Sequence, residues 1–245
     1  MTMIDAALAL SIGVAMGIFG GGGSLLLVPA LTYLMGFDAK QAVTTSLAVV
    51  GISAAVGSAA RLAQGTLPLK PALVIGSATV LGALVGSAIG VRLDDTLQLR
   101  IFGAVVVVAA VALGWQAVFG SGPARPARGR AVLAAAGVGV GVVTGLLGVG
   151  GGFLIVPALV MWANLDMREA TSVSLFVLVL ATASALIGYA SAVTPAWSFV
   201  LPFAAVASAG TVAGGIAGQS IPQRLLQQVF AAALIVVAAF ILTRG

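Results

Sequence analysis

The sequence predicts an all-α, polytopic integral membrane protein built from two homologous halves. Of its 245 residues, 61% are hydrophobic and only 7% are charged, whereas about a quarter of the residues of a soluble domain are charged. Apolar runs follow one another along the whole chain, which argues against a separate soluble domain. A glycine-rich motif occurs twice at an offset of 128 residues, and the surrounding segments repeat at the same offset. We therefore expect one membrane domain made by an internal duplication.

The inventory of polar side chains excludes several classes of function. The net charge is +5, but the 11 lysines and arginines lie in the connections between apolar runs, where they set membrane topology. We therefore expect no nucleic-acid partner. The chain has no cysteine and no histidine, which removes the commonest metal ligands and the usual acid–base group at neutral pH. The six acidic residues lie at segment boundaries. We expect no enzymatic activity, no catalytic residue, no metal site and no cofactor.

The first half, residues 1–120, begins with two apolar pieces, 4–19 and 25–35, that are each shorter than the about 20 residues of a full span. We expect them to form a broken or re-entrant helix pair around the glycines. Asp5 stands where a signal peptide would have basic residues, so the first piece should stay as a membrane segment. Three runs long enough to span a membrane follow, at 39–61, 69–91 and 97–119.

The second half, residues 131–245, repeats this order after a basic linker at 121–130. The lack of acidic residues in that linker predicts that it is cytoplasmic. If each short pair returns to the face it left, the halves are inverted; if the pair makes one net crossing, they are parallel. The distribution of arginines favours inverted repeats. The corresponding apolar segments are 131–147, 153–163, 167–191, 197–219 and 223–243.

Residues that match between the halves have two kinds of predicted role. Asp38 and Asp166 each precede a long run, where an acidic residue is typical of a helix N-cap; proton or cation coupling is the alternative. Glycines spaced by four indicate close packing of helices in lipid, rather than ligand binding. These packing glycines are Gly13, Gly82, Gly86, Gly210 and Gly214.

The two glycine breaks are the strongest candidates for a binding site. Paired interruptions in corresponding segments are typical of substrate sites in duplicated membrane proteins. A short helix that begins at Ser24 or Gly152 would direct unpaired N–H groups and a positive dipole end at an anion. Val149 interrupts the second glycine run, so the two breaks need not contribute equally. The candidate residues are Gly20, Gly21, Gly22, Gly23 and Ser24 in the first half, and Gly148, Gly150, Gly151 and Gly152 in the second.

Hydroxyl groups about two turns into the next long run form a second candidate set: Thr45 and Ser46 in the first half, and Ser172 and Ser174 in the second. They could donate to an oxyanion without placing a charge in the bilayer. Hydrogen bonds to their own or neighbouring helices are the alternative. Arg61 matches Tyr189 at the same offset, and both are further candidates. We expect Arg61 to meet the cytoplasmic face and Tyr189 to form hydrogen bonds inside the domain.

The duplicated glycine motifs, each followed by an apolar run and a proline, resemble those of the sulfite exporter TauE/SafE family of membrane permeases. The Thr45-Ser46-Leu47 and Ser172-Val173-Ser174-Leu175 stretches and the basic linker fit the same resemblance, which covers about residues 11–242. It implies a multi-pass transporter in a bacterial-type inner membrane that exports sulfite, a sulfonate or sulfoacetate. The family's glycine motifs fall on residues 20–23 and 148–152 of this chain.

From these observations we expect the two breaks to meet near the midplane, with backbone N–H groups and hydroxyls around a small anion. One half would rock against the other to give alternating access. The expected partners are this anionic substrate and the lipid bilayer, and the sequence leaves a monomer and a homodimer both open. The alternatives are a permease for another small solute or a cation, and a membrane scaffold or assembly protein that transports nothing.

Overall fold

A computed structural model describes residues 3–119, 129–147, 152–162, 165–189 and 193–222, together with 225, 226, 228–230, 232, 235 and 236. All regular structure in this part of the chain is helical. Four of the described helices are long and apolar enough to cross a membrane. They are α3 (Ala39–Ala63), α4 (Leu69–Gly90), α8 (Met167–Tyr189) and α9 (Trp197–Gln219). The predicted all-α membrane fold is confirmed.

The first half follows the predicted segments except at its second short piece. The chain begins with α1 (Met3–Phe19), and α5 (Asp95–Phe119) follows α4. Between α1 and α3 the structure has a 3₁₀ helix η1 (Gly22–Leu26), one α-helical turn α2 (Leu27–Pro29) and a π-helical turn η2 (Ala30–Leu34). This piece begins earlier than predicted and is irregular. Glycine permits the tight start, and Pro29 lacks the N–H that a regular helix would use.

The second half contains α6 (Arg130–Leu147), α7 (Gly152–Trp162), α8 and α9. Asp166 caps α8 as predicted, because its Oδ1 accepts the N–H of Glu169 at 2.8 Å. Asp38 occupies the N-cap position of α3 but makes no capping hydrogen bond with its side chain. Most of the linker at 121–130 and of the run at 223–243 lies outside the described residues. The division into 1–120, 121–130 and 131–245 stays a prediction.

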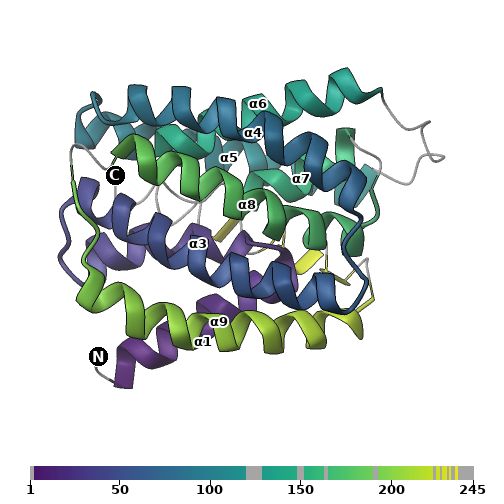
Figure 1. Ribbon diagram of the computed structural model, residues 1–245, viewed down its shortest axis with the longest axis horizontal. Coiled ribbons are helices and arrows are strands. Elements are labelled where there is room, and N and C mark those ends of the chain that lie inside the picture. The colour runs from purple at the N-terminus through teal and green to yellow at the C-terminus, as the bar shows by residue number, and fades with distance from the viewer. Residues whose placement is uncertain are drawn as a thin grey trace.

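Helices of the two halves interlock. The helix α1 packs along α9, and α6 packs along α4, so the first helix of each half lies against a long helix of the other half (Figure 1). We call α1, α3 and α9 the α1 bundle, and α4, α6 and α8 the α4 bundle. Within the α1 bundle, α3 and α9 are parallel, because Thr45 lies beside Ala196 at their starts and Arg61 beside Gly215 near their ends.

Glycines bring the interlocked helices into direct backbone contact. A Cβ atom added to Gly13 of α1 would lie 2.1 Å from the carbonyl oxygen of Ala207 in α9. One added to Gly141 of α6 would lie 2.3 Å from that of Thr79 in α4. Each residue of the second contact is related to one of the first by the offset of 128. The predicted packing role is confirmed, since similar contacts occur at Gly82, Gly86, Gly210 and Gly214.

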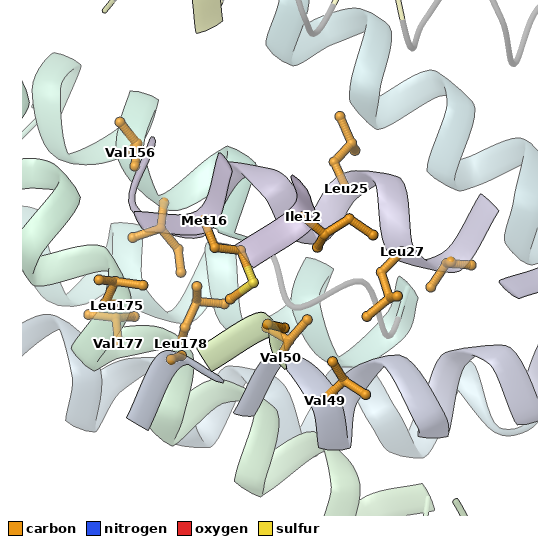
Figure 2. Close-up of a cluster of buried hydrophobic side chains, with 14 of the residues drawn as sticks. Ile12, Met16, Leu25, Leu27, Val49, Val50, Val156, Leu175, Val177 and Leu178 are labelled. Atoms are coloured by element: carbon orange, nitrogen blue, oxygen red, sulfur yellow. The ribbon is translucent and has the colours of Figure 1, made fainter. Parts of the chain in front are cut away.

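The two bundles meet mainly where α3 packs against α8. These helices run antiparallel, because Gly51 lies beside Thr182 and Gly57 beside Leu175. Corresponding helices that run in opposite directions are what an inverted duplication requires. Figure 2 shows buried side chains from α1, α3, α7 and α8 and from the segment 25–27 converging in this region. The orientation of the halves across the membrane stays a prediction.

The glycine contacts predict that Gly141→Ala destabilises the fold, because its Cβ would collide with the backbone of α4. Overpacking of this kind costs about 1–3 kcal/mol. Gly139→Ala in the same helix is the matched control, since its Cβ would meet nothing within 4 Å. Thermal unfolding in detergent, followed by circular dichroism, should give a lower midpoint for Gly141→Ala alone. Equal midpoints for the two variants would contradict the close packing of α6 on α4.

Candidate functional site

The first glycine break begins with a left-handed turn that ends α1. Gly20 has φ 64° and Gly21 has φ 95°, conformations that side chains other than glycine's rarely allow. The N–H of Gly21 donates to the carbonyl of Met16 at 2.9 Å, which is the bond of a Schellman cap. These two glycines are therefore needed for backbone conformation.

The next two glycines of the break are needed for packing. A Cβ on Gly22 would lie 2.2 Å from the ring of Phe230, and one on Gly23 would lie 2.5 Å from the carbonyl oxygen of Ile12. Ser24 lies inside η1 rather than at a helix start. Its N–H and its hydroxyl both donate to the carbonyl of Gly21, at 3.1 and 2.7 Å. The expected helix start at Ser24 is thus wrong, and both donors of Ser24 are engaged within the turn.

The two breaks contact each other. The helix α7 begins at Gly152, as predicted. A Cβ on Gly152 would lie 2.5 Å from the carbonyl oxygen of Gly21, so the two backbones touch. The expectation that the breaks meet is confirmed for this pair, while their depth in a membrane stays a prediction. Gly148, Gly150 and Gly151 lie outside the described residues.

The predicted hydroxyl groups lie on the helices beside the breaks, and the second-half pair donates to backbone carbonyls. Ser174 of α8 donates to Gly20 of the first break and to Thr171 at 2.9 Å. Ser172 donates to Arg168 at 3.1 Å. In this conformation both hydrogens serve the backbone, so donation to a substrate would require an exchange of partners.

Both first-half hydroxyl residues are fully buried on α3. Thr45 is an acceptor, taking the N–H of Ala196 at 3.3 Å, and thereby links the start of α9 to α3. Ser46 lies next to it in the same helical turn. These residues therefore lie on the α1 bundle, whereas Ser172 and Ser174 lie on α8 of the α4 bundle.

Arg61 and Tyr189 each form a hydrogen bond with the last turn of the helix that precedes a glycine break, Arg61 with α1 and Tyr189 with α6. We call α1 and α6 the broken helices. Arg61 Nη2 donates to the carbonyl of Gly17 in α1 at 3.2 Å, and the Tyr189 hydroxyl donates to that of Leu146 in α6 at 3.2 Å. The expectation for Tyr189 is confirmed. Arg61 is only 5% exposed, so its side chain is buried. That this end of α3 meets the cytoplasmic face stays a prediction. The carbonyl end of α1 and the contact with α9 hold its side chain inside the fold.

Gln98 of α5 forms a polar cluster with Tyr189 at the end of α6, although we did not predict it from the sequence. Its Nε2 donates to the carbonyl of Leu146 at 2.7 Å and to the Tyr189 hydroxyl at 2.9 Å. Its Oε1 is buried without a hydrogen-bond partner among the described residues. In the sequence, Gln98 is an amide at the start of an apolar run. Its position close to Asp95 is equally typical of the exposed first turn of a helix, so the sequence did not indicate that it is buried.

An open apolar cavity of about 180 Å³ lies along α3 and α8 and reaches the start of α9. Leu47, Gly51, Thr182, Leu186 and Trp197 are among the residues that line it. The Thr182 hydroxyl donates to the carbonyl of Leu178 at 2.7 Å, so it is occupied within its own helix. The cavity therefore offers little to an anion. Among the described residues, no group of three or more acidic side chains is placed to hold a metal ion.

Comparison with known proteins agrees with this architecture. The chain is 29% identical to a "Probable membrane transporter protein" of Xylella fastidiosa (strain Temecula1), in an alignment 244 positions long that covers 96% of this chain and 92% of that protein. It is 25% identical to a probable membrane transporter protein of Methanocaldococcus jannaschii, over 80% of this chain and 74% of that protein. YunE of Bacillus subtilis, also named a probable membrane transporter protein, matches at 28% over 47% of this chain and 41% of its own length. No solved structure matches.

The family model for "Sulfite exporter TauE/SafE" matches residues 6–241, which is nearly the whole chain. This match includes both glycine breaks, the four spanning helices and the polar cluster around Tyr189. The relatives' names and the helices together indicate a multi-pass membrane transporter. The chain belongs to the sulfite exporter TauE/SafE family.

Proposed function

We propose that this transporter exports a small sulfur-containing anion, of the sulfite, sulfonate or sulfoacetate class, across the plasma (inner) membrane. The contact between the two glycine breaks, at Gly21 and Gly152, carries the proposal, because paired broken helices that meet are typical of transporter substrate sites. The family name supports the substrate class. The acidic residues lie at segment boundaries and leave no carboxylate relay within the long helices.

An exported anion does not require such a relay. An inside-negative membrane potential drives a unit negative charge outward by about 2.3 kcal/mol per 100 mV. The hydroxyls on α3 and α8 would supply neutral donors and acceptors to an anion after an exchange of their present backbone partners. A binding site of this kind takes up an anion without adding a permanent negative charge to the membrane interior.

The packing favours movement of the two bundles rather than of the two halves. Rocking one half against the other would separate α1 from α9 and α4 from α6, whose backbones are in contact. The contact of α3 with α8 instead joins the two bundles and contains the cavity. We therefore assign alternating access to a shift of the α1 bundle against the α4 bundle, with the glycine breaks between them.

Transport is testable in liposomes that contain the purified protein and are loaded with sodium sulfite. We expect sulfite efflux that becomes faster when the liposome interior is made negative. Gly152→Val should abolish the flux, because its Cβ would collide with Gly21, while Gly139→Ala should leave it unchanged. Gly152→Val must elute from size-exclusion chromatography and unfold thermally as the wild type does for the loss of flux to count. Efflux that is absent from the wild type, or insensitive to potential and to competing sulfur oxyanions, would favour the scaffold or the neutral-solute permease.

Disulfide cross-linking can test whether the bundles or the halves move during transport. The chain has no cysteine of its own, so only the introduced pairs can form disulfides. A Cβ on Gly51 would lie 3.6 Å from that of Thr182, and one on Gly218 would lie 3.9 Å from that of Ile18. Both distances suit a disulfide. The Gly51→Cys/Thr182→Cys pair joins the two bundles, so its oxidation should stop flux and reduction should restore it.

The Ile18→Cys/Gly218→Cys pair is the matched control, since it also joins the two halves but lies within the α1 bundle. Its oxidation should leave the flux unchanged. If that cross-link also stops transport, the halves move as units and the assignment to bundles is wrong.

A further inference from the structure

Arg61 is the only charged side chain that is buried in the described part of the chain. It lies in the last turn of α3, between the carboxyl end of α1 and the glycines of α9. A Cβ on Gly215 would lie 3.5 Å from its Nη2, so the guanidinium packs against the backbone of α9. The described residues form no ion pair with it. Among the described residues, its guanidinium donates a hydrogen bond to the carbonyl of Gly17, at 3.2 Å.

Within the described part of the chain, this charge has no full counter-charge. Burial of an unpaired ion is unfavourable even after the protein relaxes. The carboxyl end of α1 supplies a partial negative charge, worth about half an elementary charge at most. The guanidinium also has a planar fork of N–H donors, of which the carbonyl of Gly17 takes one.

At the matched position, the end of α6 is bound without a cation. Tyr189, 128 residues later, binds the end of α6 with a neutral hydroxyl, and Gln98 adds a neutral amide. The counterpart of Gln98 at the same offset is Leu226, which is 3% exposed. The terminal carbonyls of α6 thus accept hydrogen bonds from neutral groups, whereas that of Gly17 in α1 accepts one from a charged group. The need for a donor at the end of α1 therefore does not explain why residue 61 is an arginine.

Arg61 also lies close to an exposed end of the molecule. Gln64, one helical turn further along, is exposed and accepts a hydrogen bond from Gln219 Nε2 at 2.8 Å. An anion that enters between the ends of α3 and α9 would therefore meet the guanidinium within about one turn, or about 5 Å, of the surface. A planar guanidinium binds oxyanions through two parallel hydrogen bonds.

We propose that Arg61 is the charge-selective subsite for the transported anion, and that the oxyanion itself is the counter-ion of this buried guanidinium. The inference rests on the proposed function in requiring an anionic substrate. It adds the residue that excludes cations and neutral solutes. Tyr189, its counterpart, offers the anion only a neutral hydrogen bond.

The experiment measures anion binding by the purified full-length protein, from the rise in unfolding temperature with sodium sulfite, sulfate, phosphate or chloride. Arg61→Gln keeps a donor for Gly17 and removes the charge, and Arg61→Tyr introduces the residue found at the matched position. Both should weaken sulfite binding by about tenfold or more, since charge-assisted hydrogen bonds are about twice as strong as neutral ones. Arg61→Lys should retain part of the binding. Lys70→Gln removes an exposed cation at the same end of the molecule and should bind as the wild type does.

A second readout separates binding from a structural role. Without anion, Arg61→Tyr should unfold at the wild-type temperature or above it, because an unpaired buried charge has been removed. Wild-type sulfite binding and flux in Arg61→Gln or Arg61→Tyr would overturn the inference and leave the proposed function intact. Unfolding of both neutral variants at a lower temperature, with sulfite binding retained, would also overturn it.

The outcomes for the wild type separate the inference from the proposed function. Binding of phosphate or chloride, but not of sulfite or sulfate, that requires Arg61 would support the subsite and overturn the sulfur substrate class. Failure of the wild type to bind any of the four anions would overturn both.

Discussion

The carbonyl groups at the ends of α1 and α6 must find hydrogen-bond donors inside an apolar fold, and the candidate site is built around the groups that satisfy them. Lipid offers no donors, so a helix that ends within a membrane domain depends on protein groups or on enclosed water. Arg61 donates a hydrogen bond to a carbonyl in the last turn of α1, while Gln98 and Tyr189 donate to one in the last turn of α6. Ser174 of α8 reaches Gly20 in the first break. The broken helices are therefore held mainly by side chains of other helices, and any movement at the breaks is coupled to α3, α5 and α8.

Glycine contacts impose a second constraint, because they join helices that belong to different halves. Backbone contacts along α1 with α9, and along α6 with α4, replace the side-chain layers that usually separate helices. Such contacts have little room to slide. The contact of α3 with α8 is different, since side chains and a cavity lie there. The duplication thus makes two bundles that each contain helices from both halves, and the unit that is repeated in sequence need not be the unit that moves.

Most of the fold could be predicted because the length of an apolar run determines whether it spans a membrane. The long helices follow the predicted segments closely, and α7 begins at Gly152 as expected. The irregular turns around Pro29 could not be predicted, since glycine and proline permit several backbone paths. Spacing also failed to reveal the burial of Arg61, because a cation at the end of a run fits an exposed turn equally well. The hydroxyls of Ser172 and Ser174 were found, but which carbonyl each one binds depends on packing between distant segments.

The difference between Arg61 and Tyr189 bears on how an anion would leave the protein. A duplicated site with a guanidinium at each end would hold an anion strongly in both places, and conduction requires binding weak enough for release. In the proposed pathway, a single guanidinium would make the two ends unequal, because an anion would meet a charged group at the end of α1 and only neutral groups at the end of α6. The shared offset of 128 preserves the backbone contacts in both halves. The side chains that donate to the ends of α1 and α6 differ, because one is an arginine and the others are neutral. This difference would give a symmetric scaffold a preferred place to bind an anion.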